Sequence, residues 1–238
     1  MGRAEMCRFV MGLGVALCAA GCGASNMEVE ALRPRLQVQG RAEARGTKIA
    51  VGAFEDGRTD ASGLLIGEAK TGFFNFSTNI IADESADVMV AEAVHEGLRK
   101  AGFAIVEPSE ADYVVTGEIA KFWVEEYATG VSLEYAKAYV KYDLLVKDAQ
   151  GKIVWGITVD EYIVSDNCWD ATVFDIPTLT RALRNSVEAI FRDESFWQAV
   201  APEVRDMRPI AATRALVNAS GRRAWSSLNG MPVRHARR

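Results

Sequence analysis

Carboxylates are the most numerous ionisable side chains in this chain of 238 residues, and two pairs are adjacent: Glu125-Glu126 and Asp160-Glu161. Two carboxyl groups flanking one bond are the apparatus of glycoside hydrolysis, as in a cell-wall hydrolase. Both pairs lie in segments predicted to be strands, where neighbouring side chains point to opposite faces. Neither pair is therefore expected to converge on one bond, and we predict no catalytic residue.

The two histidines, His95 and His235, do not suggest a reactive centre either. His95 is predicted on a helix beside its apolar stripe, as a partly buried helix residue rather than a base. No HExxH pair, CxxC pair, P-loop or GxSxG motif occurs, and no ligands stand at the spacing of a metal site. We expect no metal, no cofactor and no enzymatic activity.

Asp56 and Arg58 form the first group that could bind a ligand. They come just after the first predicted strand, at its carboxyl end, where open α/β sheets often bind ligands. The alternative is a turn that is stabilised by local hydrogen bonds and an exposed ion pair.

A second candidate contact surface consists of Tyr135, Lys137, Tyr139 and Lys141. These residues alternate with apolar ones along a predicted strand, so they share one face. Tyrosines and lysines on a rigid sheet could stack on sugars or hold a partner protein. The alternative is an ordinary solvated face with cross-strand pairs.

A strand, a helix and a second strand must position the Asp56–Arg58 group. The apolar run 48–54 predicts the first strand. Helical spacing of Val88, Ala91, Val94, Leu98 and Ala101 predicts a helix that is capped by Asp83 or Ser85 and ended by Gly102. A strand at 103–106 follows, which makes a right-handed parallel crossover.

Three long strands at 113–125, 133–147 and 152–164 are predicted next, joined by hairpin-like links. A helix begins at Pro177. The predicted fold is α/β: a single mixed sheet, β-α-β followed by a three-stranded antiparallel meander and a C-terminal helix, with helices on one face.

The N-terminal segment has the pattern of a secretory signal, with Arg3 and Arg8 before an apolar run at 9–20 that is too short to span a membrane. Ala19-Ala20-Gly21-Cys22 resembles the lipobox of bacterial lipoproteins, with alanine where leucine is usual. The resemblance implies a diacylglycerol on Cys22, which anchors the chain to a membrane. The alternative is an ordinary signal peptide that is cleaved elsewhere. No aspartate follows Cys22, which in enteric sorting rules implies the outer membrane, with the protein facing the periplasm.

Charge and composition divide the chain into four parts. Residues 1–21 are the signal peptide, and 22–46 are the lipidated cysteine and a flexible tether. Residues 47–200 hold 26 acidic and 13 basic side chains, a net charge of −13, and form the folded domain. Residues 201–238 have eight arginines and two acidic residues, and are predicted to be mostly disordered. The acidic domain argues against nucleic acid as a partner. The basic tail could contact a membrane surface, peptidoglycan or its own domain.

The order of several short motifs resembles the YajG-like family of bacterial lipoproteins. The matching pieces, besides the lipobox, are Asp56-Gly57-Arg58, Ile66-Gly67, 97–103, 111–119, 148–151 and Ala182-Leu183. Auxiliary lipoproteins of ABC-type lipid transport systems share a similar order. The resemblance spans 48–200 and implies an envelope lipoprotein without established catalysis.

The sequence thus predicts a non-catalytic, lipid-anchored envelope lipoprotein. It would bind or scaffold another periplasmic or outer-membrane component, such as an envelope protein or peptidoglycan. The alternatives are an accessory subunit of an ABC-type lipid transport system and, further off, a cell-wall hydrolase.

Overall fold

One mixed sheet organises the computed structural model, which describes residues 25–59, 63–71, 76–128, 135–165 and 176–200. Its eight strands are β1 (Ser25–Val29), β2 (Lys48–Asp56), β3 (Leu65–Thr71), β4 (Phe76–Ala82), β5 (Ala104–Ile105), β6 (Tyr113–Ala128), β7 (Tyr135–Asp148) and β8 (Ile153–Ser165). The helices are α2 (Ala86–Ala101), α3 (Ile176–Arg192) and α4 (Glu194–Val200), with short 3-10 turns η1 (Ala42–Ala44) and η2 (Pro108–Glu110). The predicted fold class is confirmed.

Strand β6 is the centre of the sheet because it has neighbours along both edges. On one edge it pairs antiparallel with β7, which pairs antiparallel with β8. On the other edge its first half pairs parallel with β2 and its second half pairs parallel with β3. Strand β5 extends the sheet beyond β2, whereas β4 and then β1 extend it beyond β3. The β3–β4 hairpin and β1 were not predicted.

The β-α-β unit runs from β2 through α2 to β5, which lies parallel to β2. Helix α2 ends at Gly102, whose φ of 103° is a left-handed conformation that glycine adopts without a steric penalty. Ser85 is the N-cap residue, but its side chain makes no capping hydrogen bond. The predicted stripe is wrong at Val88, which is 39 % exposed, because Met89, Val90 and Ala93 face the core instead.

The meander is the longest regular part of the chain, and its alternation is confirmed. On β7 every second residue from Ala136 to Val146 is buried, and the residues between them are partly exposed. A period of two on one strand means one face in the core and one face towards solvent.

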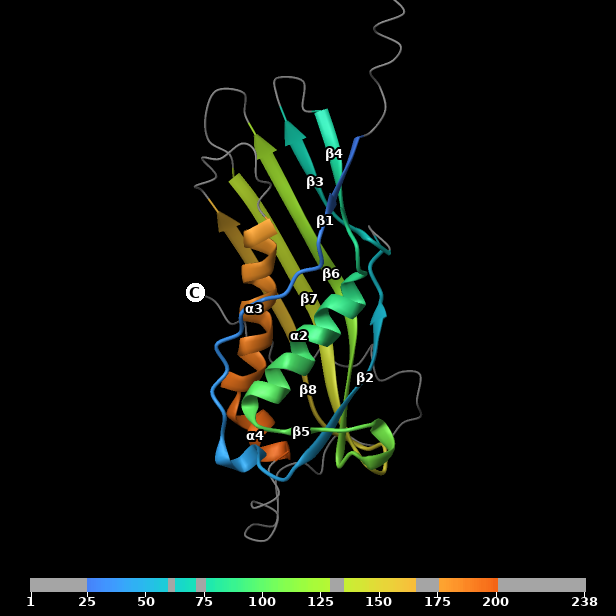
Figure 1. Ribbon diagram of the computed structural model, residues 1–238, viewed down its shortest axis with the longest axis vertical. Coiled ribbons are helices and arrows are strands. Elements are labelled where there is room, and N and C mark those ends of the chain that lie inside the picture. The colour runs from blue at the N-terminus through green and yellow to red at the C-terminus, as the bar shows by residue number, and fades with distance from the viewer. Residues whose placement is uncertain (1–24, 60–62, 72–75, 129–134, 166–175, 201–238) are drawn as a thin grey trace, which may run out of the picture.

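Helices α2, α3 and α4 all lie on one side of the sheet, as Figure 1 shows. Helix α3 packs on β7 and β8, and α2 packs on β2 and against α3. Gly97 permits the contact between the two helices, since a Cβ there would lie 2.6 Å from Cε2 of Phe191. Helix α4 was not predicted. It buries Phe196 and Trp197, and Asp193 caps it by accepting from the N–H of Ser195 at 2.8 Å.

The prediction of a flexible tether is wrong for residues 25–46. Ser25–Val29 is a sheet strand, and the chain then runs over the helices as a strap, the blue trace in Figure 1. Leu32 and Leu36 are buried, and the N–H of Gln37 donates to Oε1 of Glu188 at 2.7 Å. The sequence did not indicate this role, because Leu32 and Leu36 are only two apolar residues, four positions apart, and cannot show a helical or strand period. Pro34 and charges of both signs favoured a flexible segment instead.

Several predictions lie outside the described residues: the signal peptide 1–21, Cys22 and the basic tail 201–238. Within the part of the chain that the structure describes, no helix is long and apolar enough to cross a membrane.

Candidate functional site

Strand β6 changes its partner halfway along, and this leaves a fork in the sheet. The pairing with β2 reaches Ile119, and the pairing with β3 begins at Val124. A bulge at Ala120 lies between them, so Ile119 and Phe122 both point into the core. Backbone groups of β6 at the fork therefore need partners other than a neighbouring strand.

Arg58 fills this fork with its side chain, which is only 3 % exposed. Nη1 donates to the carbonyls of Leu65 (2.8 Å) and Phe122 (3.2 Å), and Nη2 donates to the carbonyl of Gly63 (2.9 Å). Nε and Nη2 also donate to the two carboxylate oxygens of Asp56, at 2.7 and 2.8 Å. These five bonds use all five N–H groups of a guanidinium.

Asp56 and Gly57 hold Arg58 in this position. The hydrogen bond from Arg58 lowers the pKa of the Asp56 carboxyl, against the opposing effect of partial burial. The N–H of Gly57 donates to the carbonyl of Ile119 at 3.0 Å, and a Cβ there would lie 2.7 Å from Oε1 of Glu118. The turn thus has its predicted local hydrogen bonds, but the Arg58 side chain is buried rather than exposed. We call Asp56, Gly57 and Arg58 the clamp.

Tyr135, Lys137, Tyr139 and Lys141 lie together on the helix-free side of β7, half-buried. Register places further side chains beside them, and we call the whole set the open face: Glu68, Lys70, Lys121, Trp123, Glu125, Tyr127, Tyr135, Lys137, Tyr139, Lys141, Asp160, Tyr162 and Val164. Tyr162 and Val164 are the most exposed of its large apolar residues, at 51 % and 43 %.

Aromatic rings on the open face contact one another across strands. Tyr127 and Tyr135 are stacked with ring centroids 4.8 Å apart, and Tyr139 and Tyr162 are also 4.8 Å apart at a tilt of 30°. Trp123 is the register partner of Tyr139 on β6. Trp123, Tyr139 and Tyr162 therefore form a row across three strands.

Lysine ammonium groups lie close to these rings. Lys121 Nζ is 4.5 Å from the ring centroid of Tyr139, and Lys137 Nζ is 5.0 Å from that of Tyr135. Lys141 instead pairs with Asp160 at 3.0 Å. Partial burial, with Tyr162 as the next cause, raises the pKa of Tyr139 to about 12. We expect this packing to make the face rigid.

Trp123, Tyr127, Tyr162 and Lys121 were missed as members of this surface. Their alternation on β6 and β8 is a signal that could have found them. The bulge at Ala120 shifts the alternation by one residue, however, and only the register brings the three strands together.

A groove of about 210 Å³ opens on the open face beside the fork. Trp123, Lys121, Glu68 and Glu125 line it, and Arg58 forms part of its floor. Glu68 and Glu125 are register partners on β3 and β6. Glu68 is held by Lys70 at 2.5 Å and by the hydroxyl of Ser77 at 3.1 Å. The groove thus combines an indole, two carboxylates and an ammonium group.

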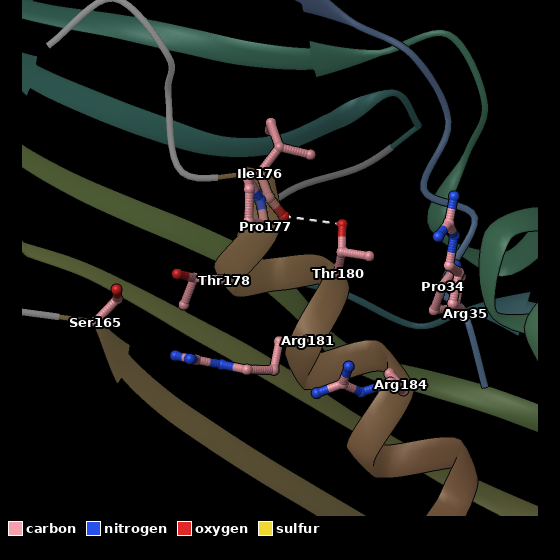
Figure 2. A pocket seen from close by; sticks show the side chains of 9 residues that line it. All are labelled: Pro34, Arg35, Ser165, Ile176, Pro177, Thr178, Thr180, Arg181 and Arg184. Atoms are coloured by element: carbon pink, nitrogen blue, oxygen red, sulfur yellow. Dashed lines mark hydrogen bonds between the residues drawn. The ribbon is translucent and has the colours of Figure 1, made fainter. Parts of the chain in front are cut away.

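A larger opening of about 510 Å³ lies at the start of α3, between Pro34-Arg35 and Ser165. Figure 2 shows Arg35 on the opposite side of it from Arg181 and Arg184, and the guanidinium groups do not converge on one point. The dashed line marks Thr180 Oγ1 donating to the carbonyl of Ile176 at 2.9 Å. This opening offers no focused anion site.

The adjacent carboxylates point to opposite faces, as predicted. Glu126 is buried at 6 % exposure, whereas Glu125 lies on the open face. Asp160 pairs with Lys141, whereas Glu161 accepts from Nδ2 of Asn185 on α3 at 2.9 Å. His95 is exposed, not partly buried. Among the described residues, no cluster of three histidine, cysteine or acidic side chains could hold a metal ion.

Comparison with known proteins gives structural likenesses alone. No family model matches the chain, and no curated protein matches its sequence. A Xanthomonas campestris protein of family DUF330 is 11 % identical over 73 % of this chain and 95 % of its own, with a TM-score of 0.45. A minor lipoprotein of Acinetobacter baumannii is 11 % identical over 63 % and 90 %, with a TM-score of 0.35. Lipoprotein GNA1162 of Neisseria meningitidis is 10 % identical over 62 % and 99 %, with a TM-score of 0.35.

Scores below 0.5 are too low to support an argument about function. What the comparisons show is that solved structures with a similar fold include small bacterial lipoproteins. The resemblance to the YajG-like family stays a prediction.

Proposed function

We propose that this chain is a non-catalytic lipoprotein of the bacterial envelope, anchored through lipid on Cys22, which binds peptidoglycan with its open face. The observation on which this depends is the row of Trp123, Tyr139 and Tyr162, which leads from the groove to the exposed ring of Tyr162. The lipobox supports the anchor, and the absence of aspartate after Cys22 supports the outer membrane.

The groove suits one sugar ring of a glycan strand. An indole can stack on the C–H face of a sugar, and charged side chains can exchange hydrogen bonds with its hydroxyl groups. Glu68 and Glu125 would accept such bonds and Lys121 would donate one. Glu68 already accepts bonds from Lys70 and from the hydroxyl of Ser77, and an oxygen held in this way suits an acceptor for sugar hydroxyl groups.

The open face is a better candidate than the clamp because its polar groups can still form bonds. Arg58 has already used every donor within the protein. No comparable observation favours the accessory subunit of a lipid transporter.

Sedimentation with purified peptidoglycan sacculi tests the binding step. We expect the full-length protein to sediment, and Trp123→Ala to weaken binding at least about tenfold, as for a ring at the centre of a contact. Val88→Ala, on an exposed position of α2, is the matched control and should bind normally. Equal binding by both variants would contradict a role for the groove. Cleavage of the glycan during the assay would point to the hydrolase instead.

Fractionation of cells tests the anchor. Replacement Cys22→Ser should move the protein from the membrane fraction to the soluble periplasm, because a stable anchor needs the acyl chains. Unchanged membrane association would exclude Cys22 as the anchor.

A further inference from the structure

Only two residues separate Cys22 from the first strand of the folded domain. Strand β1 begins at Ser25, so the link from Cys22 to Ser25 can extend at most about 11 Å, at 3.3–3.6 Å per residue. A tether that reached residue 46 would have allowed the domain to tumble far from the bilayer. A link of two residues holds one particular end of the sheet near the lipid.

Register identifies which residues share that end. Ser25 pairs with Thr78 on β4, which pairs with Ala69 on β3. Ala69 pairs with Glu126 on β6, which pairs with Ala136 on β7. These residues therefore lie level across the sheet. Tyr127 and Tyr135 lie one residue further towards the same end. In Figure 1 this is the top of the molecule, where β1 begins, β6 ends and β7 begins.

The side chains at this end are of the kinds that gather at membrane surfaces. Tyr127 and Tyr135 are stacked, with Lys137 Nζ 5.6 and 5.0 Å from their ring centroids and Lys70 Nζ 5.2 Å from that of Tyr127. Tyrosine rings prefer the headgroup level of a bilayer, and lysines there can reach lipid phosphates. We call Lys70, Tyr127, Tyr135 and Lys137 the proximal cluster.

We propose that the proximal cluster docks on the headgroups of the bilayer that holds the lipid on Cys22. The sheet then stands upright on the membrane, and the rest of the open face, from Trp123 and Tyr139 to Tyr162, points sideways into the periplasm. The inference rests on the anchor of the proposed function, but it does not depend on peptidoglycan binding.

The opposite end of the sheet supplies an internal control. Strand β7 has 14 residues, so its far end lies about 45 Å from its near end at 3.4 Å per residue. Lys152, in the turn after β7, is exposed at that far end. A docked domain keeps position 152 outside contact with lipid, whereas a domain that only swings on its link would also lie flat and bring position 152 to the surface.

The test uses the full-length lipidated protein in vesicles of phosphatidylethanolamine and phosphatidylglycerol that contain a headgroup-level spin-labelled quencher lipid. An environment-sensitive fluorescent amino acid is placed at position 77, which is exposed on β4 level with Lys70, or, in a second protein, at position 152. We expect at least about fivefold stronger quenching at 77 than at 152. The paired change of Lys70→Glu with Lys137→Glu, read from the probe at position 77, should reduce quenching at least twofold, and Lys152→Glu should not change it.

Equal quenching at the two positions in a protein whose lipid is confirmed by mass spectrometry would overturn the docking and leave the anchor intact. A mature chain without lipid on Cys22 would overturn both. Undiminished quenching in the paired lysine variant would overturn the role of the two lysines in the docking.

Discussion

The clamp and the open face occupy the same sheet and both contain cations, yet their charged groups are in opposite situations. In the clamp the Arg58 side chain is 3 % exposed and every N–H has an acceptor inside the protein. On the open face, Lys121 and Lys137 lie over aromatic rings that face solvent. Arg58 therefore has no donor left for a ligand, although it follows the carboxyl end of a strand, where ligands often bind.

The fork explains why a residue such as Arg58 is needed at all. Where β6 passes from β2 to β3, the carbonyl of Phe122 receives a bond from a side chain rather than from a strand. The clamp therefore serves stability. The open face instead presents side chains of β3, β6, β7 and β8 at the surface, where Lys121 and Lys137 lie over tyrosine rings.

The largest effect is expected at the clamp. Replacement Arg58→Met should lower the free energy of unfolding by about 3–5 kcal/mol, the cost of breaking a buried ion pair from one side. Chemical denaturation of the full-length protein measures this. The matched control is Arg99→Met, which removes an exposed pair with Glu96 and should lower the free energy of unfolding far less. Equal losses in the two variants would remove the distinction between the clamp and a surface ion pair.

A moderate effect is expected from the ring row of the open face. A double-mutant cycle with Tyr139→Ala and Tyr162→Ala should give a coupling energy of about 0.5–1.5 kcal/mol, as for other aromatic pairs. Tyr135 and Tyr162 serve as the control pair, because their rings stack on different partners, and their coupling should be near zero. A coupling near zero for Tyr139 and Tyr162 would mean that the row does not make the face rigid.

The smallest effect concerns ionisation of the same row. The pKa of Tyr139 is raised to about 12, above the ordinary value of about 10 for tyrosine. Its contribution to stability is therefore complete below pH 10 and is lost as the pH rises through 12. Replacement Tyr162→Phe should move the pKa of Tyr139 down, since Tyr162 is one cause of the shift. Titration by NMR of tyrosine Cζ measures it, and an unchanged midpoint would mean that burial alone causes the shift.

The strap shows where prediction from sequence failed, and why. Leu32 and Leu36 are buried, and Lys100 Nζ donates to the carbonyl of Leu36 at 2.9 Å. Neither residue lies in a helix or strand, so no hydrophobic period predicts its burial. Glu68 and Trp123 were missed for a different reason: they lie in two strands and line one groove, although 55 positions separate them in the chain.

The sequence by itself determined the elements whose signals are local. Gly102 ends α2, the alternation from Ala136 to Val146 makes β7 a half-buried strand, and Ala19–Cys22 marks the anchor that we propose. Local signals suffice there because the 3.6 and 2.0 residue periods are properties of one segment.

Only the tertiary structure decided which residues meet. It placed Arg58 in a fork between three strands, made β1 and the strap part of the domain, and aligned Ser25 with Glu126 near the end of the sheet. The physical reason is that these contacts depend on strand register and on a bulge at Ala120. Both are fixed by packing between segments that are distant in the chain.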